Sequence, residues 1–221
     1  MENHMNSIIT IGRESGSGGH RIGKILAREY GIPCYDKELL EKASKNSGLC
    51  QEIFESQDEK TTNSFLYSLV MGTYSGGYST SVVSEMPLNQ KVFLAQFDTI
   101  KKIAEEGPCV IIGRCADYAL ELDNRLISVF IHADLEARIQ RVAIEYNLTN
   151  AKAREFILKQ DKHRSSYYNY YTAKKWGATE SYNLSIDSGL FGIEGSVEII
   201  KRAVEAKESG FSSRIFDNPS E

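Results

Sequence analysis

The residues best suited to chemistry lie in a glycine-rich turn near the N-terminus. The segment Ser15-Gly16-Ser17-Gly18-Gly19-His20 directly follows a β-branched run at 8–11 and the tripeptide 12–14. Glycine tolerates positive φ and has no Cβ, so consecutive N–H groups in such a turn can converge on one anion. The N-terminus of a following helix adds a partial positive charge. The turn therefore predicts that these six residues bind the phosphates of a nucleotide, and a tight structural turn is the alternative.

The turn departs from both common glycine-rich nucleotide motifs. In the P-loop pattern G-x-x-x-x-G-K-[ST], the register that keeps Gly18 places Gly19 at the lysine and His20 at the hydroxyl residue. The dinucleotide pattern G-x-G-x-x-G fails because Arg21 stands at its third glycine. Arg13 or Arg21 could supply the missing cation from a different backbone position, and we favour Arg13 because it comes just before the glycine turn.

Arg114 is a candidate for binding a second phosphate. It follows Gly113 after the run 109–112, whose continuous apolar character is typical of a strand buried on both faces and central in a sheet. In parallel sheets, ligands bind beyond the carboxyl ends of the strands. We therefore expect the guanidinium of Arg114 to reach the same crevice as the glycine-rich turn.

Two further predicted helices carry arginines at helical spacing. Arg138 and Arg141 are three residues apart on the first, and Asp161 and Arg164 are three apart on the second. Guanidinium groups match phosphate oxygens and stabilise the negative charge of a phosphoryl-transfer transition state. A solvated helix face is the alternative interpretation, and for Arg138 we favour it.

The elements that position these residues alternate between strands and helices. The predicted strands are 8–11, 32–35, 109–112, 126–131 and 182–186. The helix after the first strand ends at Gly31, and Asp134 can cap the helix after the fourth. The alternation predicts an α/β fold with a parallel sheet covered by helices on both faces. We expect one domain over 1–207, with a longer helix from about 151 to 164 and a frayed tail at 208–221.

Composition excludes several classes of protein. The chain has 221 residues, 41% of them hydrophobic, and a net charge of −4, which disfavours a broad contact with nucleic acid. It has no apolar run long enough to span a membrane. The four cysteines have no C-x-x-C pair or other metal spacing, which favours a reducing cytoplasm and gives no metal ligands. The oligomeric state is not encoded in any recognisable pattern.

Three blocks of sequence together resemble the cytidylate kinase-like family, a branch of the nucleoside monophosphate kinases. The blocks are 11–19, then 110–114 with 126–131, and finally 161–164 with 182–187. The resemblance implies a P-loop nucleoside monophosphate kinase-like core with a helical acceptor-binding insertion at about 38–90 and a short lid at about 147–176. Cytidylate kinases proper carry lysine where this chain has Gly19 and aspartate where it has Cys115.

The resemblance also implies roles for individual residues. The loop from Ser15 to His20 would bind the phosphates of ATP, and Asp36 and Arg114 would face the acceptor. Arg141, Asp161 and Arg164 match the lid pattern, in which arginines close over the transferring group and the aspartate orients one of them. Mg²⁺ would bridge the donor phosphates largely through water, so no residue is assigned as its ligand.

These observations predict ATP-dependent phosphoryl transfer to a nucleoside monophosphate, with cytidylate as the first candidate. The predicted catalytic residues are Arg13, Arg141, Asp161 and Arg164. One alternative is a nucleotide-binding regulator without turnover, because Gly19 replaces the lysine. The other is a dinucleotide-dependent oxidoreductase in which Asp36 binds a ribose.

Overall fold

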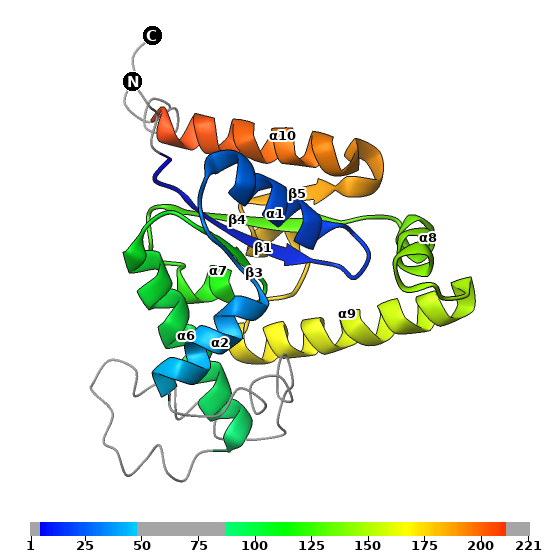
Figure 1. Ribbon diagram of the computed structural model, residues 1–221, viewed down its shortest axis with the longest axis horizontal. Coiled ribbons are helices and arrows are strands. Elements are labelled where there is room, and N and C mark those ends of the chain that lie inside the picture. The colour runs from blue at the N-terminus through cyan, green and yellow to red at the C-terminus, as the bar shows by residue number, and fades with distance from the viewer. Residues whose placement is uncertain (1–4, 48–86, 211–221) are drawn as a thin grey trace.

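The computed structural model describes residues 5–47 and 87–210, in which five parallel strands form one sheet. The strands are β1 (Ile8–Arg13), β2 (Cys34–Tyr35), β3 (Val110–Ile112), β4 (Leu126–His132) and β5 (Leu184–Asp187). Their order across the sheet is β2-β3-β1-β4-β5 (Figure 1). The predicted parallel α/β sheet is confirmed, but the strand at 109–112 is not its centre. That place belongs to β1.

The central position of β1 follows from its pairing on both sides. Ile9 lies opposite Val110 of β3 and Ile127 of β4. Ile8, Ile9 and Ile11 are fully buried, so the strand is covered on both faces. Both β1 and β3 are continuous apolar runs, and such runs show burial on two faces without giving the order of the strands.

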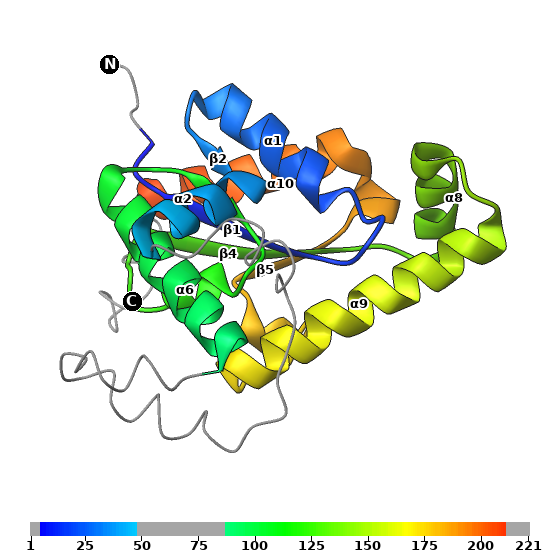
Figure 2. The same ribbon diagram turned by 60° about the horizontal axis from the view of Figure 1, so that its bottom comes forward.

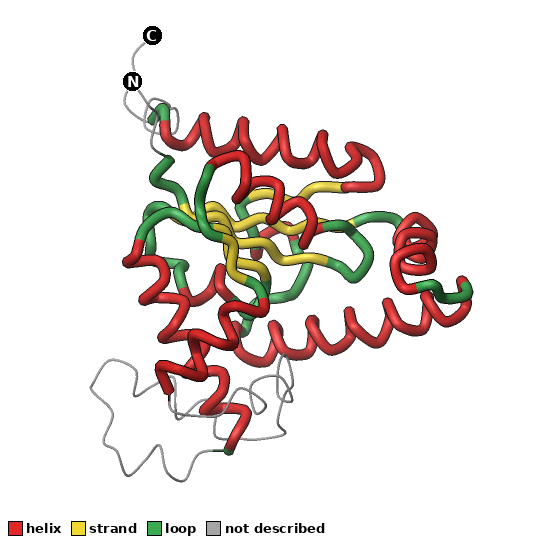
Figure 3. The backbone as a smooth tube through the Cα atoms, in the orientation of Figure 1, coloured by secondary structure: helices red, strands yellow, loops and turns green. Residues whose placement is uncertain are grey.

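Helices cover both faces of the sheet. The α-helices that the structure describes are α1 (Gly19–Tyr30), α2 (Lys37–Ser47), α6 (Leu88–Glu106), α7 (Ala116–Ala119), α8 (Leu135–Tyr146), α9 (Asn150–Thr172) and α10 (Ser188–Glu208). Helices α1 and α10 lie on one face of the sheet, and α2, α6 and α7 lie on the other (Figures 1 and 3). Their buried side chains form two hydrophobic clusters with the side chains of the strands. A short 3₁₀ helix at Thr179–Ser181 precedes β5.

The predicted helix ends are confirmed. Gly31 ends α1 in the left-handed conformation with φ 65°, and its N–H donates to the carbonyl of Arg28 at 3.3 Å. The carboxylate of Asp134 accepts from the N–H of Glu136 at 2.8 Å at the start of α8. Both signals are local, because they depend only on residues within one turn of the helix end.

Helix α9 is longer than the helix predicted at about 151–164. Its last turns bury Tyr167 and Tyr171 against α6, where Tyr171 stacks on Phe93 with ring centroids 4.0 Å apart. Its first turns pack on α8, so α8 and the start of α9 lie together beyond the carboxyl ends of the strands, and α9 runs from there to α6 (Figures 1 and 2). The lid expected at 147–176 is therefore essentially this one long helix.

Parts of the other expected segments lie outside the described residues. Of the insertion expected at 38–90, the structure describes most of α2 and the start of α6, and the stretch 48–86 is not described. The expected tail is described only as far as Gly210. Among the helices that are described, none is long and apolar enough to cross a membrane.

Candidate phosphate-binding site

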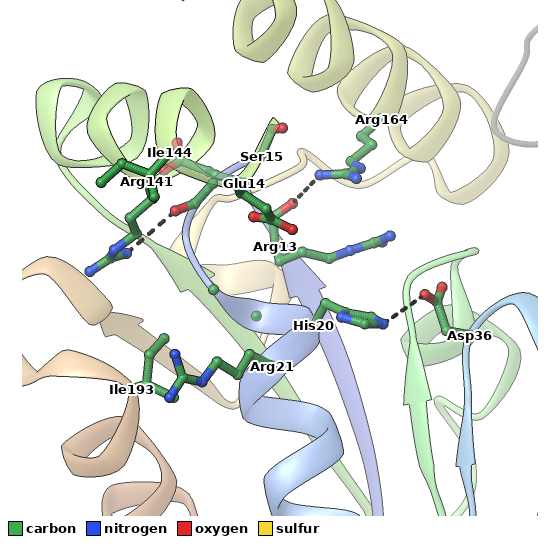
Figure 4. A pocket seen from close by; sticks show the side chains of 14 residues that line it. Arg13, Glu14, Ser15, His20, Arg21, Asp36, Arg141, Ile144, Arg164 and Ile193 are labelled. Carbon is green, nitrogen blue, oxygen red and sulfur yellow. Dashed lines mark hydrogen bonds and ion pairs between the residues drawn. The ribbon is translucent and has the colours of Figure 1, made fainter. Parts of the chain in front are cut away.

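A cavity of about 550 Å³ lies where β1 ends and α1 begins (Figure 4). Its lining includes four arginines and most of the glycine-rich loop. The lining residues are Arg13, Glu14, Ser15, Gly16, Gly18, Gly19, His20, Arg21, Asp36, Arg141, Ile144, Glu145, Arg164 and Ile193. The structure thus brings together nine of the twelve predicted site residues around one space, leaving Ser17, Arg114 and Asp161 just behind its wall.

The glycine-rich loop has the conformation that anion binding requires. Gly16 and Gly18 adopt φ values of 78° and 83°, and helix α1 begins at Gly19 without a side-chain cap. The N–H groups of Gly18, Gly19 and His20 have no acceptor among the residues that the structure describes. Unpaired amides at a helix N-terminus form a site for phosphate oxygens.

Close packing explains why glycine is needed twice in this loop. A Cβ on Gly16 would lie 2.9 Å from the carbonyl oxygen of Arg138. A Cβ on Gly18 would overlap the side chain of Ile193. Either substitution would also strain the positive φ. Space and backbone conformation together select glycine at Gly16, and at Gly18, where the end of the Ile193 side chain can move, the conformation selects it.

Gly19 leaves room for the side chain of Arg13. A Cβ on Gly19 would lie only 2.6 Å from the Cβ of Arg13, which is fixed by the end of β1. The position that carries lysine in the P-loop pattern therefore has no space for a side chain while Arg13 keeps its place. In Figure 4 the Arg13 side chain extends between Arg164 and the pair formed by His20 and Asp36. A cation is present at the loop, but it comes from the preceding strand.

His20 and Asp36 face one another on the side of the cavity next to the end of β2. The Nε2 atom of His20 lies 3.3 Å from Oδ2 of Asp36 (Figure 4). Burial by itself raises the pKa of Asp36, but the guanidinium groups of Arg114 and Arg13 outweigh it and hold the pKa below its usual value. Asp36 is therefore ionised at neutral pH.

Arg114 holds Asp36 in place by hydrogen bonds to its carboxylate and its carbonyl oxygen. Its side chain is only 4% exposed, and Nη1 donates to the Asp36 carbonyl at 2.8 Å and to Oδ1 at 3.1 Å. Gly113, Arg114 and Cys115 all have positive φ, between 54° and 74°. Such backbone strain is held only where surrounding structure fixes it, and it is frequent at functional sites. Arg114 lines a small hollow beside the main cavity, together with Arg13 and Arg164, and it contacts the main cavity through Asp36.

Arg141 holds the loop from helix α8. Its Nη1 donates to the carbonyl of Ser17 at 3.2 Å and to that of Gly16 at 3.4 Å. Its Nη2 donates to the carbonyl of Ser188 at 2.9 Å. These acceptors are neutral, so the positive charge of Arg141 is not cancelled by them. The guanidinium both fixes the loop and adds charge to the cavity.

Asp161 and Arg138 correct two expectations. The Oδ1 atom of Asp161 accepts from the N–H of Ser15 at 2.7 Å, and Oδ2 accepts from Nη1 of Arg138 at 2.6 Å. The aspartate therefore orients Arg138, and neither Arg141 nor Arg164 donates to it in the structure. The side chain of Arg138 is only 9% exposed and not on a solvated face. Its burial depends on α9, which spacing within α8 could not reveal.

Arg164 and Glu14 complete the site. Nη1 of Arg164 lies 3.5 Å from the carbonyl oxygen of Arg13, so α9 also reaches the end of β1 (Figure 4). Glu14, which the sequence reasoning passed over, accepts from the N–H of Ala133 at 3.1 Å. Burial raises its pKa, although that hydrogen bond and the charge of Arg138 oppose the rise. The position of Glu14 within the turn was a signal that could have found it.

The residues around the cavity fit a magnesium ion that is held mainly by nucleotide phosphates and water. His20 supplies no oxygen at the place of the P-loop hydroxyl. The described residues contain no cluster of three acidic, histidine or cysteine side chains that could hold a metal ion. Glu14 and Asp36 can still contact the hydration shell, and Mg²⁺ commonly keeps several waters when it binds with phosphates.

The fold and the loop define an α/β protein with the fold of the nucleoside monophosphate kinases. The family model described as "Cytidylate kinase-like family" matches residues 8–190, and the chain belongs to that family. A cytidylate kinase of Archaeoglobus fulgidus is 26% identical over 205 residues, covering 90% of this chain and 96% of that protein. One from Methanococcus vannielii is 23% identical over 203 residues, covering 90% and 99%.

Solved structures show the same architecture. An uncharacterized protein from Eubacterium ventriosum has a TM-score of 0.69 and 29% identity, covering 90% of this chain and 99% of its own. A shikimate kinase from Bacteroides thetaiotaomicron has a TM-score of 0.50 at 16% identity, covering 90% and 98%. The second likeness concerns the fold alone.

Proposed function

We propose that this protein transfers the γ-phosphoryl group of ATP to a nucleoside monophosphate, with cytidylate as the first acceptor to test. The observation that carries the proposal is the juxtaposition of unpaired loop amides with four arginines around one cavity. Such donors stabilise the charge that spreads over the moving group. The cytidylate kinases among the relatives suggest the acceptor.

On the donor side, the loop from Ser15 to His20 binds the ATP phosphates. Arg13 takes the part of the missing lysine, because its side chain fills the space beside Gly19. Arg141 fixes the loop carbonyls, and Arg164 brings a second charge from α9 to the end of β1. Mg²⁺ bound with the nucleotide would neutralise part of the phosphate charge, and Glu14 and Asp36 would contact its hydration shell.

On the acceptor side, Asp36 and Arg114 act as a pair. Arg114 positions the ionised carboxylate of Asp36, which borders the cavity and faces the incoming nucleotide. The acceptor itself lies between this pair and α9. We place the acceptor-binding insertion at about 38–90 and the lid at about 147–176, within one domain that extends over 1–207.

A nucleotide-binding regulator without turnover is the second candidate. Gly19 and His20 favour it, because they stand where lysine and a hydroxyl residue normally contact phosphate and metal. The two candidates share the same nucleotide site and differ only in phosphoryl transfer. The dinucleotide oxidoreductase gains no support from the family to which the chain belongs.

The deciding experiment is a panel of nucleoside monophosphates incubated with ATP and Mg²⁺, followed by chromatography of the products. We expect a nucleoside diphosphate and ADP in equal amounts, and cytidylate is the expected best acceptor. ADP formation without acceptor sets the background hydrolysis. ATP binding without transfer to any acceptor would favour the regulator.

A further inference from the structure

Arg138 is a buried arginine that contacts the first residue of the glycine-rich loop. Its Nε donates to the carbonyl of Ala133 at 3.0 Å, and Nη1 lies 3.3 Å from the carbonyl oxygen of Ser15. Two carboxylates face the same guanidinium: Oδ2 of Asp161 at 2.6 Å and Oε2 of Glu14 at 3.3 Å. The end of β1, the start of α8 and helix α9 therefore meet at this one side chain.

The two carboxylates pose an electrostatic problem for a site that receives a polyphosphate. Glu14 lines the cavity, and Asp161 accepts a hydrogen bond from the N–H of Ser15, the residue at which the loop begins. Their side chains are only 23% and 15% exposed, so water screens them weakly. Without a compensating cation, both charges would repel the phosphates of ATP.

We propose that Arg138 is a positioning residue for nucleotide binding, because it neutralises Glu14 and Asp161 while fixing the first turn of the loop. This proposal rests on the proposed function. Arg138 does not line the cavity and so acts through the loop and the two carboxylates. Its fork of donors reaches all its acceptors from one fixed position, which the single ammonium of a lysine cannot do.

The net charge around Arg138 distinguishes this role from simple packing. The cluster of Arg138, Glu14 and Asp161 has one cation and two anions, a net charge of −1 when all are ionised. Arg138→Met leaves −2, whereas Arg138→Met combined with Asp161→Asn restores −1. An asparagine at 161 keeps an oxygen that can accept from the N–H of Ser15. The double variant therefore repairs the charge without restoring the arginine.

The experiment measures the dissociation constant of ATP by calorimetry for the wild type and both variants. We expect Arg138→Met to weaken ATP binding about tenfold or more, because it leaves two partly buried carboxylates without their cation. The double variant should recover at least half of that loss on a logarithmic scale. Arg138→Lys keeps the charge without the fork and should lie between Arg138→Met and the wild type.

Arg125→Met is the matched control for loss of a partly buried arginine. Arg125 donates to Asp123 and to the carbonyl of Ala104 at the opposite end of the sheet. Its replacement should leave ATP affinity unchanged. Circular dichroism melts identify any variant that fails to fold, and in that case Arg138→Lys against the wild type still decides the question.

Two results would overturn the proposal: wild-type affinity in a folded Arg138→Met variant, or a double variant that binds as weakly as Arg138→Met. The second result would make the role purely structural. A wild type that binds no ATP would defeat this proposal together with the proposed function. A wild type that binds ATP but transfers no phosphoryl group would defeat only the proposed function.

Discussion

The two ends of the parallel sheet use arginine in different ways. At the amino end, Arg125 forms an ion pair with Asp123, with Nη2 2.7 Å from Oδ2. At the carboxyl end, Arg141 is held by the carbonyl oxygens of Gly16, Ser17 and Ser188. The charge of Arg125 is cancelled by its partner, and that of Arg141 is oriented without being cancelled.

This difference separates stability from binding. A local ion pair such as that of Arg125 fixes a loop and leaves little net potential. Carbonyl oxygens can hold a guanidinium in place while its charge stays available to an anion in the cavity. At the carboxyl end, the N–H groups at the start of α1 have no acceptor among the described residues. At the amino end, the Glu208 carboxylate accepts hydrogen bonds from the N–H groups of Asn6 and Ser7. We expect substitutions at the two ends to affect different measurements.

The largest effect is expected for Arg13→Ala. Removing one preorganised donor from a developing phosphoryl charge typically lowers turnover about a hundredfold to a thousandfold. The measurement is the rate of phosphoryl transfer at saturating ATP and acceptor, with folding checked by thermal melting. Arg202→Ala is the control, since that side chain is 76% exposed, pairs with Glu205 on α10 and does not line the cavity. Wild-type turnover in Arg13→Ala would show that the charge comes from elsewhere.

Gly18→Ala should weaken ATP binding about tenfold or more. The added methyl group meets Ile193, and the residue must keep a φ of 83°. Gly31→Ala is the matched control, with φ 65° and no atom within 4 Å of the added group. Both variants should lose about 1–2 kcal/mol of stability from the left-handed conformation. Equal ATP affinity in the two variants would contradict the assignment of the glycine-rich loop to the ATP-binding site.

Arg125→Met should affect stability alone. The variant loses hydrogen bonds to Asp123 and to the carbonyl of Ala104, which we expect to lower the free energy of unfolding by about 1–2 kcal/mol. Urea unfolding measures this loss. Phosphoryl transfer, assayed well below the melting temperature, should be unchanged. A fall in turnover with unchanged stability would contradict the division between the two ends.

On folding stability, Asp36→Asn should produce the smallest of these effects, a loss that depends on pH. The lowered pKa of Asp36 favours the folded state once the carboxyl is ionised, with Arg114 and Arg13 outweighing the opposing burial. That stabilisation is present above the ordinary aspartate pKa of about 3.9 and is lost as pH falls through the lowered value. Unfolding of both proteins at several pH values should therefore show a difference that narrows in acid. A constant difference would contradict the assignment.

The sequence predicted those features that depend on local pattern. Alternation of apolar runs located the strands, the glycines located the loop, and Asp134 and Gly31 marked helix ends that the structure confirms. These signals rely on residues within a few positions of one another. Strand order was not accessible in this way, because β1 and β3 are equally apolar and their order depends on the path of the helices between them.

The parts of the site that the sequence missed depend on long-range contacts. Arg138 is buried because Asp161 approaches it from another helix, 23 residues along the chain. Arg114 turns beneath Asp36, 78 residues away, so it supports a carboxylate and does not line the main cavity. The space that Gly19 leaves for Arg13 likewise appears only when β1 and α1 are seen together.

The most direct test of the account is whether ATP stabilises the folded protein through the glycine-rich loop. Thermal melting should show a rise in melting temperature with ATP, equivalent to about 2.7 kcal/mol at a hundredfold excess over the dissociation constant. The rise should be smaller in Gly18→Ala at the same ATP concentration and unchanged in Gly31→Ala. No shift with ATP, together with a clear shift with NAD, would contradict the kinase account and support a dinucleotide site.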